Sequence, residues 1–301
     1  MKIKNVHGAP LLLIVISVLL IVAGFVDLDF LAVGGNPFLA SALLEVLIFA
    51  IPAAIYARAR GRKFFSHMRF RPFKAFDIPL MIFALGFMIF GGATVSFYIY
   101  RFAPELFRAT ASSFADSGVG VGIYAVLSAA ILPAITEEFI YRGIVCAEYE
   151  RNGVALAVIL SSLTFALIHF DIVKLPVYFI NGVVLALVMY ATRSIFASMI
   201  VHAAANILTL FFEIYVYRAA VRQGGGIVLF TFICTAAALL FAFLFFNSCS
   251  KAYADMSSSG VASDYAKRKK LADGRYVREA LTSPLFIILL IISAVGAIIN
   301  F

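Results

Sequence analysis

The stretch ITEEFIYRG, residues 135–143, places three charged side chains within six residues of an otherwise apolar run. These side chains are Glu137, Glu138 and Arg142. Ionisable groups are costly inside a bilayer, and those that occur there usually pair with one another or serve a function. The stretch therefore raises two linked questions: which fold tolerates these charges, and what chemistry they support.

The composition of the whole chain answers the first question. Of 301 residues, 63% are hydrophobic and 13% are charged, and the mean hydropathy is +1.03. Soluble domains carry about 25% charged residues, so we expect an integral membrane protein with an all-α fold. The three cysteines match no disulfide framework or metal-binding spacing.

Apolar runs along the chain predict a polytopic helical bundle. A membrane span needs about 20 mostly apolar residues, and the predicted spans are 9–26, 37–57, 78–100, 119–147, 153–170, 175–191, 195–217, 226–247 and 284–301. We expect about 8–9 transmembrane helices. The corresponding division of the chain is an N-terminal part with a basic loop, a central core and a C-terminal part with a cytoplasmic linker, at residues 1–112, 113–217, 218–301 and, for the linker, 248–283.

The net charge of +8 follows from membrane topology in this interpretation, so no nucleic-acid partner is predicted. An intracellular N-terminus puts 19 of the 24 basic residues on the inner side, as the positive-inside rule expects. The five outer ones are Arg101, Arg108, Lys174, Arg218 and Arg222. We therefore expect a multi-pass protein of the cell membrane with a cytoplasmic N-terminus.

Helical geometry separates Glu137 from the other two charged residues of the stretch. Residues four apart lie about 40° apart around a helix, so Glu138 and Arg142 share a face and can pair. Glu137 is about 140° away from Arg142. The spacing thus predicts a structural ion pair and one free carboxylate that points into a cavity.

Further polar groups fall inside the predicted spans. His202 and Asn206 are four residues apart on one helix face, and such a pair can donate hydrogen bonds to a developing oxyanion. Counting from the cytoplasmic edges, Glu137 lies about 15–20 Å deep, His202 and Asn206 about 12–20 Å, and His169 about 25 Å unless Pro133 kinks a helix. These depths favour a site in the cytoplasmic half of the bilayer. Glu45 and Glu213 have no evident partner, and we expect them to bridge helices or line a cavity.

Three motifs in order resemble the signature of the CPBP family, which comprises CAAX prenyl endopeptidases and the bacterial Abi or bacteriocin-processing proteins. The motifs are Glu137-Glu138-x-x-x-Arg142, Phe165-x-x-x-His169 and His202-x-x-x-Asn206, within residues 120–210. The chain departs from the family where a common glycine is Ala186 and a usual small residue is Arg193. These departures affect packing and a loop.

The resemblance implies an intramembrane glutamic endopeptidase with a cavity open toward the cytoplasm and a membrane-associated peptide or protein substrate. It implies that Glu137 activates water with His169, that His202 and Asn206 form the oxyanion hole, and that Glu138 and Arg142 brace the site. No cofactor is expected. One Glu and two His leave zinc open as an alternative, although the HExxH motif is absent.

A different class of function also fits a polar membrane cavity. A non-catalytic scaffold, an immunity protein or a transporter would use the same groups for binding. The sequence shows no paired, interrupted spans of the inverted-repeat type. It does not distinguish between prenylated and other substrates.

Overall fold

The computed structural model describes residues 5–25, 37–102, 122–211, 226–258 and 274–299. In chain order its helices are α1 (Asn5–Gly24), α2 (Pro37–Glu45), η3 (Val46–Ala50), α3 (Ile51–Arg60), α4 (Arg62–Phe65), η4 (Ala75–Asp77), α5 (Ile78–Phe102), α7 (Ile123–Val126), η5 (Leu127–Ile131), α8 (Leu132–Glu138), η6 (Phe139–Val145), α9 (Cys146–Tyr149), η7 (Glu150–Asn152), α10 (Val154–Leu167), α11 (Leu175–Thr192), α12 (Ile195–Phe211), α14 (Gly226–Ser258), α16 (Gly274–Leu281) and α17 (Pro284–Ile299). The elements η3, η5 and η6 are π-helical turns, and η4 and η7 are 3₁₀ turns.

The predicted all-α membrane bundle is confirmed. Among the described residues, five helical segments are long and apolar enough to cross a membrane: Phe38–Arg60, Ala75–Ile99, Ile123–Tyr149, Leu175–Thr192 and Val228–Met256. Four shorter apolar helices accompany them: Gly8–Gly24, Val154–Leu167, Ile195–Leu210 and Pro284–Ile299. Each predicted span corresponds to one of these segments, and the described ranges contain no strand.

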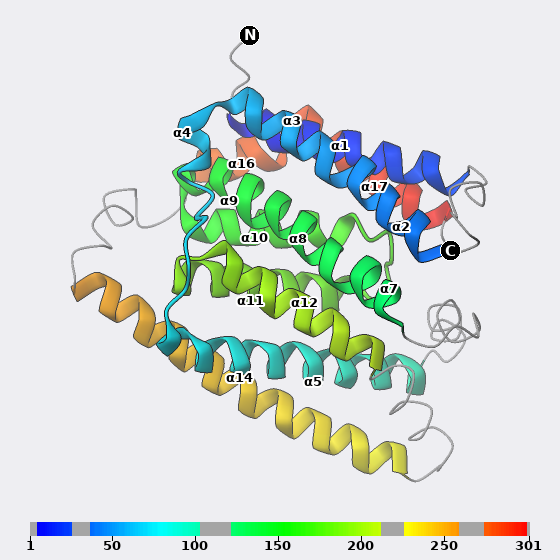
Figure 1. Cartoon of the computed structure of the whole chain (residues 1–301), viewed down its shortest axis with the longest axis vertical. Coiled ribbons are helices and arrows are strands. Elements are labelled where there is room, and N and C mark those ends of the chain that lie inside the picture. Colours follow the sequence, from blue (N-terminus) through cyan, green and yellow to red (C-terminus); the bar gives the residue numbers. More distant parts are fainter. Residues whose placement is uncertain (1–4, 26–36, 103–121, 212–225, 259–273, 300–301) are drawn as a thin grey trace.

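The helices lie side by side in layers (Figure 1). On one side α1 packs on α17, and on the opposite side α5 packs on α14. Between these layers lie α10, α11, α12 and the continuous helix from α7 to α9, with α10 against α11 and α12 against α5. Helices from both ends of the chain therefore enclose the segment that carries the three motifs.

The outer helix α14 exposes large apolar side chains on its outer face. Its side chains Phe232, Leu239 and Phe243 are exposed, whereas Phe245 is completely buried against the α5–α12 layer. Lipid tails are as apolar as these side chains. Exposed aromatic and aliphatic residues on α14 therefore form a lipid-facing surface, and no polar face is required on this helix.

Charged loops meet at one end of the bundle. The Arg69 guanidinium donates to Glu150 at 2.6 Å, and Arg60 donates to Glu148 at 2.5 Å from both Nε and Nη2. The amide of Ile195 donates to the Arg69 carbonyl at 3.1 Å, which ties this loop to the turn between α11 and α12. We call this end the basic end, and it comprises residues 58–77, 148–153 and 192–195. It lies on the left of Figure 1, near α4 and α9.

The helix that carries ITEEFIYRG runs without a break from Ile123 to Tyr149 and contains two π turns. Pro133 follows the first of them, at the start of α8. Proline has no backbone N–H and clashes with the preceding turn of a regular α-helix, and a wider turn accommodates it. The structure thus places a π turn where the sequence predicts a kink.

The predicted linker 248–283 contains helix in both of its described parts. The membrane helix α14 continues beyond the predicted end at residue 247 as far as Ser258, and α16 covers Gly274–Leu281. The basic run Lys267–Lys270 lies outside the described residues.

Gly182 allows α10 and α11 to approach closely, and this contact gives a testable prediction. A Cβ at Gly182 would lie 2.8 Å from the Ser162 Cα and 2.9 Å from its Cβ. We expect Gly182→Ala to lower the free energy of unfolding by about 1–3 kcal/mol, because backbone has to move. Thermal unfolding in detergent measures the effect. Gly91→Ala is the matched control, since its nearest contact is an ordinary 3.6 Å to Phe87. Equal stability of the two variants would contradict the prediction.

Candidate active site

Glu138 and Arg142 form a completely buried ion pair within one helix. Arg142 Nη1 donates to Glu138 Oε1 at 2.7 Å, and both side chains are 0% exposed. Arg142 Nη2 donates to the Gly182 carbonyl of α11 at 2.9 Å, and the guanidinium lies 4.7 Å from the Phe165 ring centroid. The predicted pair is confirmed. Arg142 was counted among the basic residues of the inner side of the membrane. Its side chain instead lies in the protein interior and connects three helices.

Glu137 is separated from this pair, as its angular position predicts. Its side chain is 12% exposed, and Oε2 lies 3.7 Å from His202 Nε2. Within the described part of the chain, Oε2 has no hydrogen-bond partner. An unpartnered buried carboxylate oxygen is costly, and it can accept a hydrogen bond from water or from a substrate.

His202 lies between the two carboxylates. Its Nδ1 is 2.9 Å from Glu138 Oε1, and its Nε2 faces Glu137. Glu138 is the carboxylate partner of Arg142 and accepts hydrogen bonds only, so Nδ1 of His202 must carry a proton. In a neutral ring Nε2 would then have none. His202 can donate from Nε2 only when both ring nitrogens are protonated.

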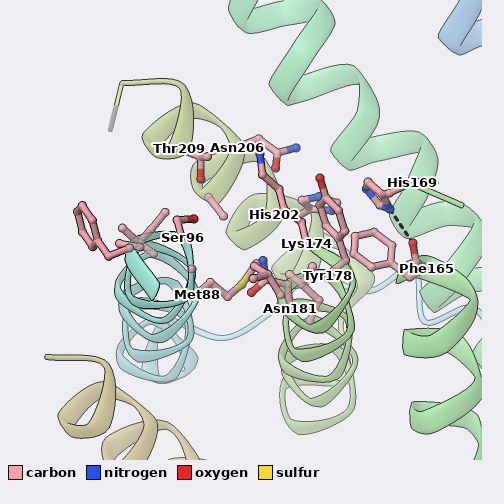
Figure 2. Close-up of a pocket in the computed structure, with 17 residues that line it drawn as sticks. Met88, Ser96, Phe165, His169, Lys174, Tyr178, Asn181, His202, Asn206 and Thr209 are labelled. Atoms are coloured by element: carbon pink, nitrogen blue, oxygen red, sulfur yellow. Dashed lines mark hydrogen bonds between the residues drawn. The ribbon is translucent and has the colours of Figure 1, made fainter. Parts of the chain in front are cut away.

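His169 lies just after the end of α10, and its Nδ1, like that of His202, faces an acceptor. Its Nδ1 is 2.7 Å from the Phe165 carbonyl (Figure 2). A carbonyl only accepts, so Nδ1 donates and Nε2 of the neutral ring is a free acceptor. The ring stacks on Tyr178 with centroids 3.9 Å apart, and the Phe165 ring meets both His169 and His202 edge to face.

A cavity of about 180 Å³ brings three of the four predicted catalytic residues together. His169, His202 and Asn206 line it, from the end of α10 and from α12 (Figure 2). Asn206 Nδ2 donates to the Ala130 carbonyl at 3.4 Å and keeps a second N–H for another acceptor. Glu137 is not among the lining residues: its carboxylate faces His202, not the cavity as predicted.

The cavity extends from the middle of the bundle toward the end away from the basic end. Helices α5 and α12 begin at the basic end, and their lining residues come from 88–97 and 202–209. Helix α11 finishes at the basic end, and its lining residues run from Val177 to Leu185, together with Lys174 just before it. The opening of the cavity toward the cytoplasm stays a prediction.

Sequence reasoning missed several polar residues of the cavity. Ser96 on α5 and Tyr178 on α11 were not singled out, and Lys174 counted only as an outer charge. Asn181 is an amide inside a predicted span, but no role was predicted for it. The signal was the spacing on α11. Lys174, Tyr178 and Asn181 are separated by four and three residues, which places them on one face.

The carboxyl group of Glu45 bridges two helices. Its Oε1 accepts a hydrogen bond from the Thr136 hydroxyl, which connects the end of α2 to α8. Thr136 is the neighbour of Glu137, so Glu45 fixes the helix at the site of the free carboxylate. Bridging was one of the two roles expected for Glu45. Glu213, for which the same roles are predicted, lies outside the described residues.

The donor groups do not form a metal site. In the described ranges, no group of three His, Cys, Asp or Glu side chains is arranged to hold a metal ion. Zinc sites need three or four such ligands at about 2.0–2.3 Å. The residues present therefore do not fit the zinc alternative.

Comparison with known proteins adds one finding. Residues 120–208 match the family model described as type II CAAX prenyl endopeptidase Rce1-like. This match confirms the resemblance to the CPBP family, and the Rce1-like segment contains all seven named residues of the three motifs. The family indicates a membrane-embedded protease of the CAAX type. No curated protein and no solved structure matches the chain.

Proposed function

We propose that this protein is an intramembrane endopeptidase that hydrolyses a peptide bond of a membrane-associated protein or peptide, with Glu137 as general base. One observation carries the proposal: within the Rce1-like segment, an unpartnered buried carboxylate adjoins a cavity lined by His169, His202 and Asn206. These are a base, two imidazoles and an amide donor. Such a set can catalyse the hydrolysis of an amide.

The buried charges support a particular protonation state. Arg142 is permanently charged, and Glu138 balances it at 2.7 Å. A doubly protonated His202 is balanced by Glu137, so the four groups have no net charge. Buried charges are tolerated when they are paired. In this state His202 presents an Nε2 proton, and Glu137 can accept one.

In the proposed reaction each of the four groups has its own role. The oxygen of a water molecule attacks the scissile carbonyl carbon while one of its protons passes to Glu137. His169 Nε2 accepts a hydrogen bond from the second hydrogen and orients the water. The N–H groups of His202 and Asn206 stabilise the negative charge on the carbonyl oxygen. When the C–N bond breaks, Glu137 returns the proton to the leaving amine, and the products are a carboxylic acid and an amine.

A comparison of cell peptides tests this function and does not require an identified substrate. Membrane and secreted peptides would be compared between cells that carry the native protein and cells that carry Glu137→Gln. We expect new peptide ends that depend on Glu137. An identical peptide set, at equal protein levels, would reject hydrolysis and favour a binding role for the cavity.

We also propose that hydrolysis needs no metal ion. Chelator treatment of the purified protein is expected to leave the cleavage rate unchanged, because the donor set does not fit a metal. Elemental analysis of the active sample provides the second measurement. Loss of activity with a chelator, restored by zinc, would show that the side chains rearrange around a metal.

A further inference from the structure

The surface of the basic end is positively charged because its acidic side chains are buried. Asp77, Glu148 and Glu150 are the acidic residues within 58–77, 148–153 and 192–195, and they are 7%, 1% and 4% exposed. Arg60 and Arg69 pair with the two buried glutamates. Five other basic side chains of this end are exposed and form no ion pair with any described residue: Arg58, Arg62, Lys63, Arg71 and Lys74. We call these five residues the basic surface.

Exposed phenylalanines lie between these cations along the chain. Phe65, Phe70 and Phe76 are 39%, 40% and 69% exposed. The centroid of the Phe76 ring is 5.2 Å from Nζ of Lys74. Mixed aromatic and basic side chains are typical of segments at the membrane surface, where the rings reach the acyl chains and the cations reach the headgroups.

The basic surface lies at the boundary of the membrane-spanning part of the chain. Residues 61–74 connect two candidate spans, Phe38–Arg60 and Ala75–Ile99. In Figure 1 this loop runs from α4 to the start of α5 along the left side of the bundle. Since both ends of the loop join membrane helices, we expect its exposed side chains to lie at the level of the lipid headgroups.

Contacts with other segments hold this loop in place. Met68 is completely buried, and its methyl group would lie 2.7 Å from a Cβ added at Gly143 in η6. Arg69 donates to Glu150 at 2.6 Å, and the Arg69 carbonyl accepts a hydrogen bond from the Ile195 amide. A surface that is already ordered loses little conformational entropy when it binds a ligand.

We propose that the basic surface binds anionic phospholipid headgroups of the surrounding bilayer. Arginine and lysine donate charge-assisted hydrogen bonds to phosphate oxygens. Neighbouring like charges repel one another, and an anionic headgroup offsets this repulsion, whereas a zwitterionic headgroup carries a cation of its own. The exposed phenylalanines favour a lipid over a soluble polyanion, because their rings gain contact with acyl chains. This inference does not depend on the proposed endopeptidase activity.

Tryptophan fluorescence tests this lipid selectivity, since the chain contains no tryptophan. Phe76→Trp places a single indole beside Lys74. Phe232→Trp places one at an exposed position near the start of α14, at the end of the bundle opposite the basic end (Figure 1). Each variant is reconstituted in vesicles of equal parts phosphatidylcholine and phosphatidylglycerol, with one lipid or the other brominated. We expect stronger quenching by brominated phosphatidylglycerol in Phe76→Trp, and equal quenching by the two lipids in Phe232→Trp.

Removal of cations identifies the source of the selectivity. In the Phe76→Trp background, Lys63→Gln combined with Arg71→Gln is expected to weaken the association of phosphatidylglycerol relative to phosphatidylcholine about fivefold or more, since one basic residue near an anionic membrane surface has an effect of about fivefold. Ala59→Gln, at an exposed position of α3, adds the same amide without removing a charge and should keep the native preference. High salt should act in the same direction as the double variant, because it screens exposed charges.

Three results would overturn the proposal. Equal quenching by the two lipids in Phe76→Trp would leave the basic surface to a soluble anionic partner. An equal preference in both tryptophan variants, or one that survives the loss of Lys63 and Arg71, would show that the preference has another source. Loss of the preference on addition of inorganic phosphate at constant ionic strength would show that the surface binds a free anion and not a headgroup.

Discussion

Replacement of Glu137 with Gln is expected to reduce the rate of peptide cleavage by about 10²–10⁴-fold, the usual contribution of a positioned general base. The amide keeps the size of the side chain but accepts no proton from water. It also removes the negative charge next to His202 Nε2, 3.7 Å away, so the same change weakens the oxyanion donor. The measurement is the cleavage rate of a reporter by purified protein.

Folding and charge need separate controls for this variant. Glu279→Gln on α16 changes an exposed carboxylate in the same way, and its cleavage rate should equal that of the native protein. The unfolding temperature of Glu137→Gln should stay close to the native value, because Oε2 accepts no hydrogen bond and meets His202 Nε2 only at 3.7 Å. Native activity in Glu137→Gln would remove this residue from the reaction.

Replacement of Arg142 with Met is expected to lower the free energy of unfolding by about 3–5 kcal/mol, because it leaves a buried carboxylate without its partner. Both members of the pair are 0% exposed, so solvent cannot replace the guanidinium. The variant also loses the bond to the Gly182 carbonyl. Denaturant titration in detergent micelles measures the loss.

A double variant separates charge from packing in this region. Glu138→Gln combined with Arg142→Met removes both charges, and we expect it to regain part of the stability lost in the single variant. Arg62→Met, at an exposed position of the basic end, should change stability by less than about 0.5 kcal/mol. If the double variant is no more stable than Arg142→Met, the buried charge is not the cause of the loss.

Local periodicity predicted the parts of this protein that depend on a single helix. The positions of the apolar segments follow from composition, because each must match the thickness of the bilayer. The pairing of Glu138 with Arg142, and the separation of Glu137 from it, follow from residue spacing around one helix. Both agree with the structure.

Side-chain contacts between different helices could not be predicted from residue spacing along one helix. The spacing that joins His202 to Asn206 does not reveal that Glu138 holds His202 by its other nitrogen. Nor does it reveal that Glu45, far away in the chain, reaches Thr136. The depth calculation placed the residues at reasonable distances from the basic end. It could not show that Arg69 of the loop before α5 pairs with Glu150, since that pair is a tertiary contact.

The π turn η6 has a consequence for the whole helix in which it lies. It separates Glu137 and Glu138, which both face His202, from Glu148, which binds Arg60 at the basic end. A π turn contains one residue more than an α turn, and one residue corresponds to about 100° of rotation. The turn therefore sets the rotation between the half of the helix that carries the proposed base and the half that binds Arg60. Deletion of a single residue from 139–145 would leave all these charged groups in the chain but direct the two halves to different neighbours, so we expect activity to depend on residue count as much as on residue type.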